Sequence, residues 1–356
     1  MTDKYWRRCM KMRLVVLIIF SYLFIPCISN AASYILNDEE TLYLGGYQIE
    51  TYMYEIGKVI EDSMDRKIFI IKDKNIKEFL ATPDSIYLYE LSNKGFIAVS
   101  TSRKDEQIRG YVKQLYIYDV NGNKIKKIEE VPVKKEAYFS WSPDGDKIAY
   151  IKGKTIIEGR RDFVPSGVWI YDVESDKVQK IADKGVQIFW AKHDNNIYIQ
   201  NQFDRDDPTD ISVYDTKKGE LSKSDKKGII FSDDGNYYIG TEISGIEGEG
   251  TLYDHFVFDG KSNEKIYKFK DEDGTPNEYY EDHKFISATH YLVFWSRRSY
   301  KIFDIETKSF INKAKLKGLV GWNADMTKAI VYERGDKIHI DEMLTGKRLK
   351  TLDLPK

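Results

Sequence analysis

A short motif of alternating apolar residues followed by aspartate recurs along most of the chain, and it limits the fold more than any other feature. The copies read IFIIKDKNI, LYIYDVNGNKI, VWIYDVESDKV, SVYDTKKGEL, FVFDGKSNEKI, KIFDIETKSF and IHIDEMLTGKRL. Alternation of this kind is typical of a strand, and aspartate favours a turn that leads into another strand. The aspartates recur every 37 to 53 residues: Asp73, Asp119, Asp172, Asp215, Asp259, Asp304 and Asp341.

A second motif, two apolar strands around a tight turn, precedes the copies from Asp119 onward. It is clearest in YFSWSPDGDKIAY at 138–150. Pro143 presets φ for the first turn position, Asp144 can accept a hydrogen bond from its own backbone, and Gly145 tolerates a positive φ. Similar stretches occur at 86–100, 188–200, 229–240, 285–295 and 319–332. Together the two motifs predict four strands in each unit.

Four strands every 40 to 50 residues are the signature of a β-propeller blade. A four-stranded sheet has two apolar faces, and neighbouring blades around an axis cover both of them. We therefore expect an all-β fold, a single β-propeller domain over 32–356. The aspartates count seven blades, an N-terminal one at about 33–81 and six more over about 82–354. The alternative is six blades, with the N-terminal segment lending a strand to close the ring.

The unit at 137–182 resembles the repeat of the TolB-like, or WD40-like (PD40), β-propeller proteins. It carries WSPDGDKIAY followed by GVWIYDVESDKVQKI, and the other units match in outline over about 270 residues. The resemblance implies a periplasmic or extracellular propeller that binds proteins or small ligands.

The first 31 residues have the layout of a secretory signal peptide. Five basic residues precede an apolar run from Leu14 to Ile28, and Ser29 and Ala31 fit the small-x-small cleavage rule. The run has 15 residues, whereas a bilayer span needs about 20. We expect cleavage after Ala31 and an exported protein, periplasmic, on the cell surface or extracellular. A leader retained as an anchor stays the alternative.

Composition argues against several functions. Both cysteines, Cys9 and Cys27, lie in the leader, so the mature chain has no thiol nucleophile or thiolate metal site. The net charge of −2 disfavours nucleic acid as a partner. The five histidines have no zinc-motif spacing, and no nucleophile elbow or phosphate-binding loop is present. We therefore expect no catalytic residues, no metal and no cofactor.

Connections between the second and third strands of four successive units are long, at 101–113, 152–166, 201–210 and 244–254. Long loops on a rigid scaffold often carry function, and arginine beside aromatic residues suits an interface. The predicted binding residues are Arg103, Lys104, Arg109, Tyr111, Arg160, Arg161, Phe163, Arg205 and Tyr253. We expect a non-enzymatic binding or scaffold protein for a protein, peptide or glycan. The alternatives are loops without a selected partner, and a lyase, cyclase or glycosidase in the central channel, which the apolar first strands disfavour.

Overall fold

A computed structural model gives the structure of the chain between Ser33 and Asp353, with interruptions. The described residues are 33–36, 41–45, 67–72, 75–105, 110–131, 138–156, 162–201, 210–247, 250–269, 282–296, 299–311, 319–323, 326–333 and 337–353. The predicted leader and its cleavage site lie outside these residues.

In the described residues, twenty-eight strands form six sheets, and five of these sheets have four strands each. The first two are β5 (Ser85–Leu91), β6 (Ile97–Asp105), β7 (Gly110–Tyr118) and β8 (Lys124–Val131), then β9 (Phe139–Trp141), β10 (Lys147–Ile156), β11 (Asp162–Asp172) and β12 (Lys177–Ala182). The third and fourth are β13 (Gln187–Trp190), β14 (Ile197–Gln200), β15 (Ile211–Asp215) and β16 (Glu220–Lys223), then β17 (Ile230–Phe231), β18 (Tyr237–Glu247), β19 (Gly250–Asp259) and β20 (Lys265–Lys268). The fifth is β21 (Asp282–Phe285), β22 (Tyr291–Ser296), β23 (Ser299–Asp304) and β24 (Ser309–Ile311).

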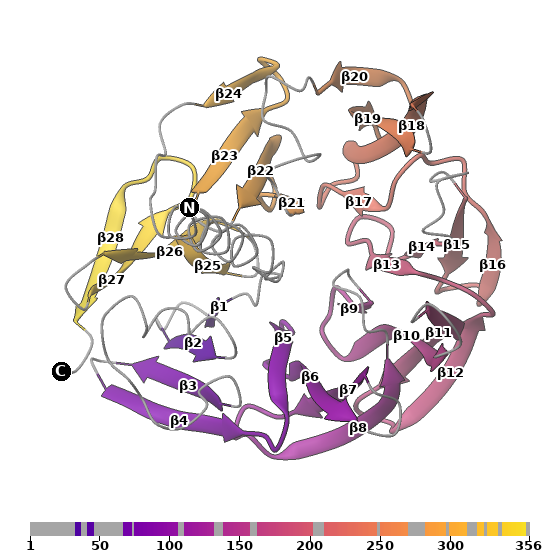
Figure 1. Ribbon diagram of the computed structural model, residues 1–356. Coiled ribbons are helices and arrows are strands. Elements are labelled where there is room, and N and C mark those ends of the chain that lie inside the picture. Colours follow the sequence, from indigo (N-terminus) through magenta and orange to yellow (C-terminus); the bar gives the residue numbers. More distant parts are fainter. Residues whose placement is uncertain are drawn as a thin grey trace, which may run out of the picture. The chain divides into compact units, whose positions relative to one another are not determined.

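The sixth sheet has eight strands and joins the two ends of the described chain. It contains β1 (Ser33–Leu36), β2 (Thr41–Gly45), β3 (Lys67–Lys72), β4 (Asn75–Ala81), β25 (Leu319–Asn323), β26 (Lys328–Glu333), β27 (Lys337–Glu342) and β28 (Arg348–Asp353). Consecutive strands in every sheet pair antiparallel, whereas β1 pairs parallel with β25, with Tyr34 opposite Trp322. Figure 1 shows the sheets arranged around a common centre with the first strand of each innermost.

The all-β propeller with four strands in each repeat is confirmed, but the count of seven separate blades is wrong. The structure has six sheets, as in the alternative, because β1 extends the ladder of β25 and merges the N-terminal strands with the last unit. The last unit also keeps its own fourth strand, β28. The N-terminal strands therefore close the ring by edge-to-edge pairing.

The core lies between neighbouring sheets, as expected for sheets that bury both faces. One cluster joins the sheets β5–β8 and β9–β12 to β13–β16 through fully buried side chains such as Ile148, Ile151 and Ile197. Another is an aromatic stack between β13–β16 and β17–β20, in which the Phe231 ring lies 4.3 Å from Tyr198 and 5.3 Å from Tyr238 between centroids. Aromatic side chains thus fill the space between these two sheets.

Five of the seven motif aspartates cap the turn between the third and fourth strands, as predicted, and Asp73 lies outside the described residues. The Asp119 carboxylate accepts hydrogen bonds from the backbone N–H of Asn121 and of Asn123, both at 2.8 Å. Asp172, Asp215, Asp259 and Asp304 accept equivalent backbone hydrogen bonds. Asp341 differs, because it is 1% exposed and pairs with Arg348 Nε at 3.3 Å. The motif is therefore structural.

Candidate functional site

The two ends of the sheets differ, and this difference locates the candidate site. At one end, the turns between first and second strands of neighbouring sheets touch. Asn93 Nδ2 donates to Pro143 O at 2.8 Å, and Lys192 pairs with Asp233 at 2.9 Å. We call this end the turn face. Hydrogen bonds and ion pairs join neighbouring turns on this face, so the turns cannot change length or position without losing these contacts.

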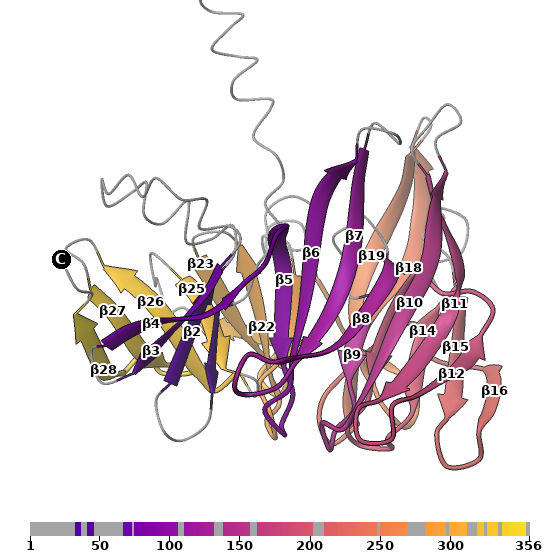
Figure 2. The same cartoon turned by 90° about the horizontal axis from the view of Figure 1, so that it is seen from below.

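At the opposite end, which we call the hairpin face, second and third strands continue as long hairpins in three sheets. The strands β6 and β7 have 9 residues each, and β10, β11, β18 and β19 have 10 or 11. The equivalent strands β22, β23, β26 and β27 have 6 residues each. Figure 2 shows the long strands reaching well beyond β22 and β26. On the hairpin face, the second and third strands of the first, second and fourth four-stranded sheets therefore extend further than those of the fifth and sixth sheets.

The segments predicted as long loops are mostly strand. β10 continues to Ile156 and β11 begins at Asp162, with Thr155 opposite Phe163. Likewise, β18 continues to Glu247 and pairs with β19 almost to its end. Backbone hydrogen bonds between the strands hold these segments in place, so they are ribbons rather than loops. The connection at 202–209 lies outside the described residues.

The predicted binding residues fall into two groups. Four of them, Arg109, Arg160, Arg161 and Arg205, lie outside the described residues. The backbones of the other five lie on the long hairpins: Arg103 and Lys104 on β6, Tyr111 on β7, Phe163 on β11 and Tyr253 on β19. Lys104 is opposite Tyr111, and Phe163 is on a different sheet. The structure therefore places these five backbones on the hairpin face, spread over three sheets.

In several sheets, polar residues face each other across the second and third strands, close to the hairpin face. Thr101 is opposite Gln114 on β6 and β7. Thr241 is opposite His255 on β18 and β19, and Thr241 Oγ1 lies 3.2 Å from His255 Nδ1. Asn201 Nδ2 donates to Asp210 Oδ1 at 3.2 Å in the third four-stranded sheet.

The corresponding pairs in the last two sheets are more hydrophobic, Trp295 with Tyr300 and Tyr332 with Ile338. The polar pairs were missed by sequence reasoning. The signal for them was a polar residue a few positions into the second strand of several units.

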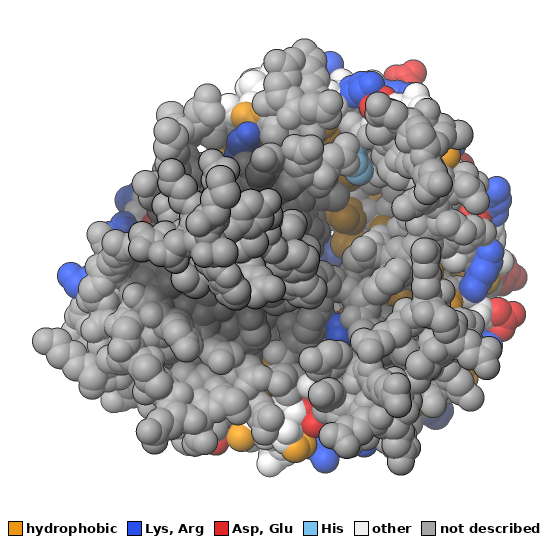
Figure 3. Space-filling view, in the orientation of Figure 1, with side chains coloured by type: hydrophobic (Ala, Val, Ile, Leu, Met, Phe, Trp, Pro, Cys, Tyr) orange, Lys and Arg blue, Asp and Glu red, His pale blue; other side chains and the backbone are white. Residues whose placement is uncertain are grey.

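Figure 3 looks onto the hairpin face and shows a hollow near the centre of the ring. The described side chains visible inside it are mainly hydrophobic, with Lys or Arg side chains nearby. Among the described residues, no group of three or more His, Cys, Asp or Glu side chains could hold a metal ion.

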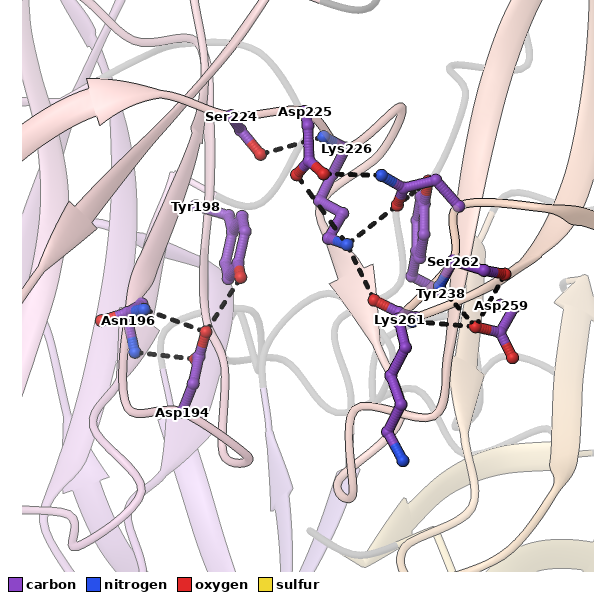
Figure 4. A network of polar contacts seen from close by, with 12 residues as sticks. Asp194, Asn196, Tyr198, Ser224, Asp225, Lys226, Tyr238, Asp259, Lys261 and Ser262 are labelled. Carbon is purple, nitrogen blue, oxygen red and sulfur yellow. Dashed lines mark hydrogen bonds and ion pairs between the residues drawn. The ribbon is translucent and has the colours of Figure 1, made fainter.

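A polar network links the connection between the third and fourth four-stranded sheets to the turn after β19 (Figure 4). Lys226 Nζ donates to Gly260 O at 2.7 Å and to Asn263 Oδ1 at 2.8 Å, and Asn263 Nδ2 donates to Asp225 at 2.6 Å. Tyr238 OH also donates to Asn263 Oδ1 at 3.2 Å. The network connects the segment before β17 with the turn after β19, so it holds the connecting segment against the fourth four-stranded sheet.

Asp194, on the turn face, carries a perturbed carboxyl group. Burial would raise its pKa, but His193, the Asn196 N–H and the Tyr198 hydroxyl together outweigh burial and lower the pKa from 3.8 to about 2. Tyr198 OH donates to Asp194 Oδ2 at 2.9 Å, and His193 Nε2 lies 3.3 Å from the same atom. The carboxylate therefore stabilises the turn beside the aromatic stack.

The pKa of Asp194 is lower in the folded than in the unfolded state. Its carboxylate therefore contributes fully to the free energy of unfolding above about pH 4, and this contribution is lost as the pH falls towards 2. We expect Asp194→Asn to lower the free energy of unfolding by about 2 kcal/mol at pH 7, with the difference from wild type vanishing near pH 2. Urea unfolding at several pH values measures this. Asp183→Asn, at a side chain 96% exposed, serves as the control and should have little effect. A difference for Asp194→Asn that stays constant with pH would contradict the assignment.

Comparison with known proteins gives one partial match. The family model described as "Dipeptidyl peptidase IV (DPP IV) N-terminal region" matches residues 92–157, from the turn before β6 to just beyond β10. No curated protein matches. The matching family is a β-propeller type of domain and so agrees with the fold of the six sheets, which defines the class of this protein as a β-propeller. The TolB-like assignment stays a prediction.

Proposed function

We propose that this β-propeller is an exported, non-enzymatic binding or scaffold protein that engages a protein, peptide or glycan through its hairpin face. The observation that carries the proposal is the difference between the two ends. Strands of up to 11 residues extend one end, whereas the equivalent strands of the last sheets stop at 6. Extensions that the core does not require are where recognition commonly resides on rigid scaffolds.

The export part of the proposal depends on the basic, apolar and small-residue order of the first 31 residues. The described residues include no helix long and apolar enough to cross a membrane. The description of the matching family names a peptidase, but the match covers residues 92–157 alone. The matched range contains the strands from β6 to β10, so the match supports the β-propeller fold over parts of two neighbouring sheets.

The binding surface is tested by replacing Arg160, Arg161 and Phe163 together with alanine. Phe163 lies on β11 of the second long hairpin, and Arg160 and Arg161 precede it closely in the sequence. Arginine and aromatic residues commonly dominate binding energy at interfaces. We expect recovery of bound molecules from the native envelope or culture fluid to fall at least about tenfold, as measured by quantitative mass spectrometry and glycan arrays.

The matched control replaces Lys217, Lys218 and Leu221 with alanine, which also removes two cations and one apolar side chain. Lys218 is 69% and Leu221 45% exposed, at the β15–β16 turn and on β16. The control should recover the same molecules as wild type. If the hairpin variant recovers them equally well, the proposed binding surface is wrong.

A further inference from the structure

The strand β1 enters the ring from the hairpin face. The first strand of each unit runs from the hairpin face to the turn face, as β5 does, whose end at Leu91 leads into the turn that contains Asn93. β1 lies parallel to the first strand β25, with Ser33 opposite Gly321. The start of β1 is therefore directed towards the hairpin face, on the inner side of the ring (Figure 1).

The stretch between β1 and the apolar run of the predicted leader is short. The four residues 29–32 separate Ser33 from Ile28, where the apolar run ends. An extended chain spans at most about 3.5 Å per residue, so a stretch of this length reaches about 14 Å in any conformation. As long as the apolar run stays in a membrane, the inner part of the hairpin face is held within this reach of the membrane.

The long hairpins extend further than this stretch can reach. The strand β9 begins at Phe139, opposite Tyr150 of β10, and β10 continues for six more residues to Ile156. At about 3.3 Å per residue, such an extension adds about 20 Å beyond the start of the first strand. The strand β18 likewise continues past Ile239, opposite the first strand β17, as far as Glu247.

Comparison of the two lengths shows what a retained leader does to the hairpin face. The stretch of about 14 Å is shorter than the extension of about 20 Å, so the ends of the hairpins meet the lipid head groups. A folded partner of about 100 residues has a radius of gyration of about 13 Å and does not fit in the space that remains. The turn face, at the opposite end of the sheets, stays accessible.

We propose that removal of residues 1–31 is required for binding at the hairpin face, because the retained leader holds this face against the membrane. The inference rests on the proposed function for the identity of the binding face. A signal peptidase would add one water molecule across the Ala31–Ala32 peptide bond, leaving a carboxylate on Ala31 and a free amino group on Ala32. Cleavage thus does more than release the protein, since it also exposes the surface that recognises the partner.

The experiment compares the accessibility of the two faces in cleaved and uncleaved chains. Both cysteines lie in the leader, so after their replacement by serine a single introduced cysteine reports on one position. Ser244→Cys places it on an exposed residue of the β18–β19 hairpin. Ser175→Cys is the matched control on an exposed residue of the turn face, two residues after Val173, whose N–H donates to Asp146 O at 2.9 Å.

Each full-length chain is produced in membranes with its leader and treated with a bulky, membrane-impermeant maleimide of polyethylene glycol. Cleavage is blocked by Ser29→Phe together with Ala31→Phe, which break the small-x-small rule. We expect equal labelling at the two positions in the cleaved chain. In the uncleaved chain, labelling of Ser244→Cys should be almost completely lost and labelling of Ser175→Cys kept. Detergent should restore labelling at Ser244→Cys, which shows that the uncleaved chain is folded.

Equal labelling at the two positions of the uncleaved chain in intact membranes would overturn the inference. Labelling at Ser244→Cys that detergent does not restore would also overturn it, because the membrane would not then be what covers the hairpin face. The labelling needs no partner, so it is independent of the proposed function. A cleaved chain that recovers the same molecules with and without Arg160, Arg161 and Phe163 would overturn the proposed function alone.

Discussion

Replacing Phe231 with alanine will lower the free energy of unfolding by about 3–5 kcal/mol. Phe231 is 4% exposed and lies at the centre of the aromatic stack between the third and fourth four-stranded sheets. Its ring centroid is 4.3 Å from Tyr198, 5.3 Å from Tyr238 and 5.2 Å from His193. Removing the ring leaves a cavity that both sheets would have to move to fill, and closely packed strands move little.

Urea denaturation monitored by circular dichroism provides the measurement, and Leu221→Ala is the matched control. Leu221 is on β16 of the third sheet, but it is 45% exposed, so its truncation should change the free energy by no more than about 0.5 kcal/mol. Equal effects of the two substitutions would mean that the stack does not hold the sheets together. Phe231→Leu should recover part of the loss, because it keeps most of the apolar volume.

The repeat could be predicted from the sequence because its signals are local. Pro143, Asp144 and Gly145 form their turn from their own conformational preferences, and Gly145 has the positive φ of 78° that its position predicts. The aspartate caps also depend on neighbours within four residues, as at Asp119. Strand alternation and turn chemistry therefore gave the all-β propeller and its four-strand units.

Ring closure could not be predicted in the same way. The pairing of β1 with β25 brings together Tyr34 and Trp322, which are far apart in the sequence and carry no local sign of their pairing. Counting aspartates treats every repeat as independent, so it cannot detect two repeats that share one ladder. The count of seven blades was wrong for that reason.

The sequence could predict that the connections between second and third strands are uneven in length, but not that they are β-hairpins. The uneven lengths of these connections can be read from the sequence. That they are paired strands and not loops depends on pairings such as Thr155 with Phe163, which the lengths do not indicate. The stretch before Ile156 contains a β-branched residue at Thr155, a signal for strand that the neighbouring glycine and lysines obscured. The burial of Lys113 could not be predicted, because it results from packing against other parts of the chain. The residues beside Lys113 in the sequence would look the same if the lysine were exposed.

Gly145→Ala will lower the free energy of unfolding by at least about 3 kcal/mol, far more than the same change at Gly346. Both glycines have a left-handed backbone, with φ of 78° and 67°. A Cβ at Gly145 would lie 2.9 Å from the backbone nitrogens of Asn93 and Lys94, which belong to the turn of the neighbouring sheet. Nothing lies within 4 Å of a Cβ at Gly346.

The comparison separates backbone strain from contact between sheets. Strain alone costs an alanine about 1–2 kcal/mol, which is the effect we expect at Gly346. At Gly145 the turn must also move away from Asn93, which breaks the Asn93 Nδ2 to Pro143 O hydrogen bond of 2.8 Å. Urea midpoints of both variants, together with Asn93→Ala, measure each part. If Gly145→Ala and Gly346→Ala lose equal stability, the turns of neighbouring sheets do not pack as closely as their geometry requires, and the turn face is not the fixed end of the propeller.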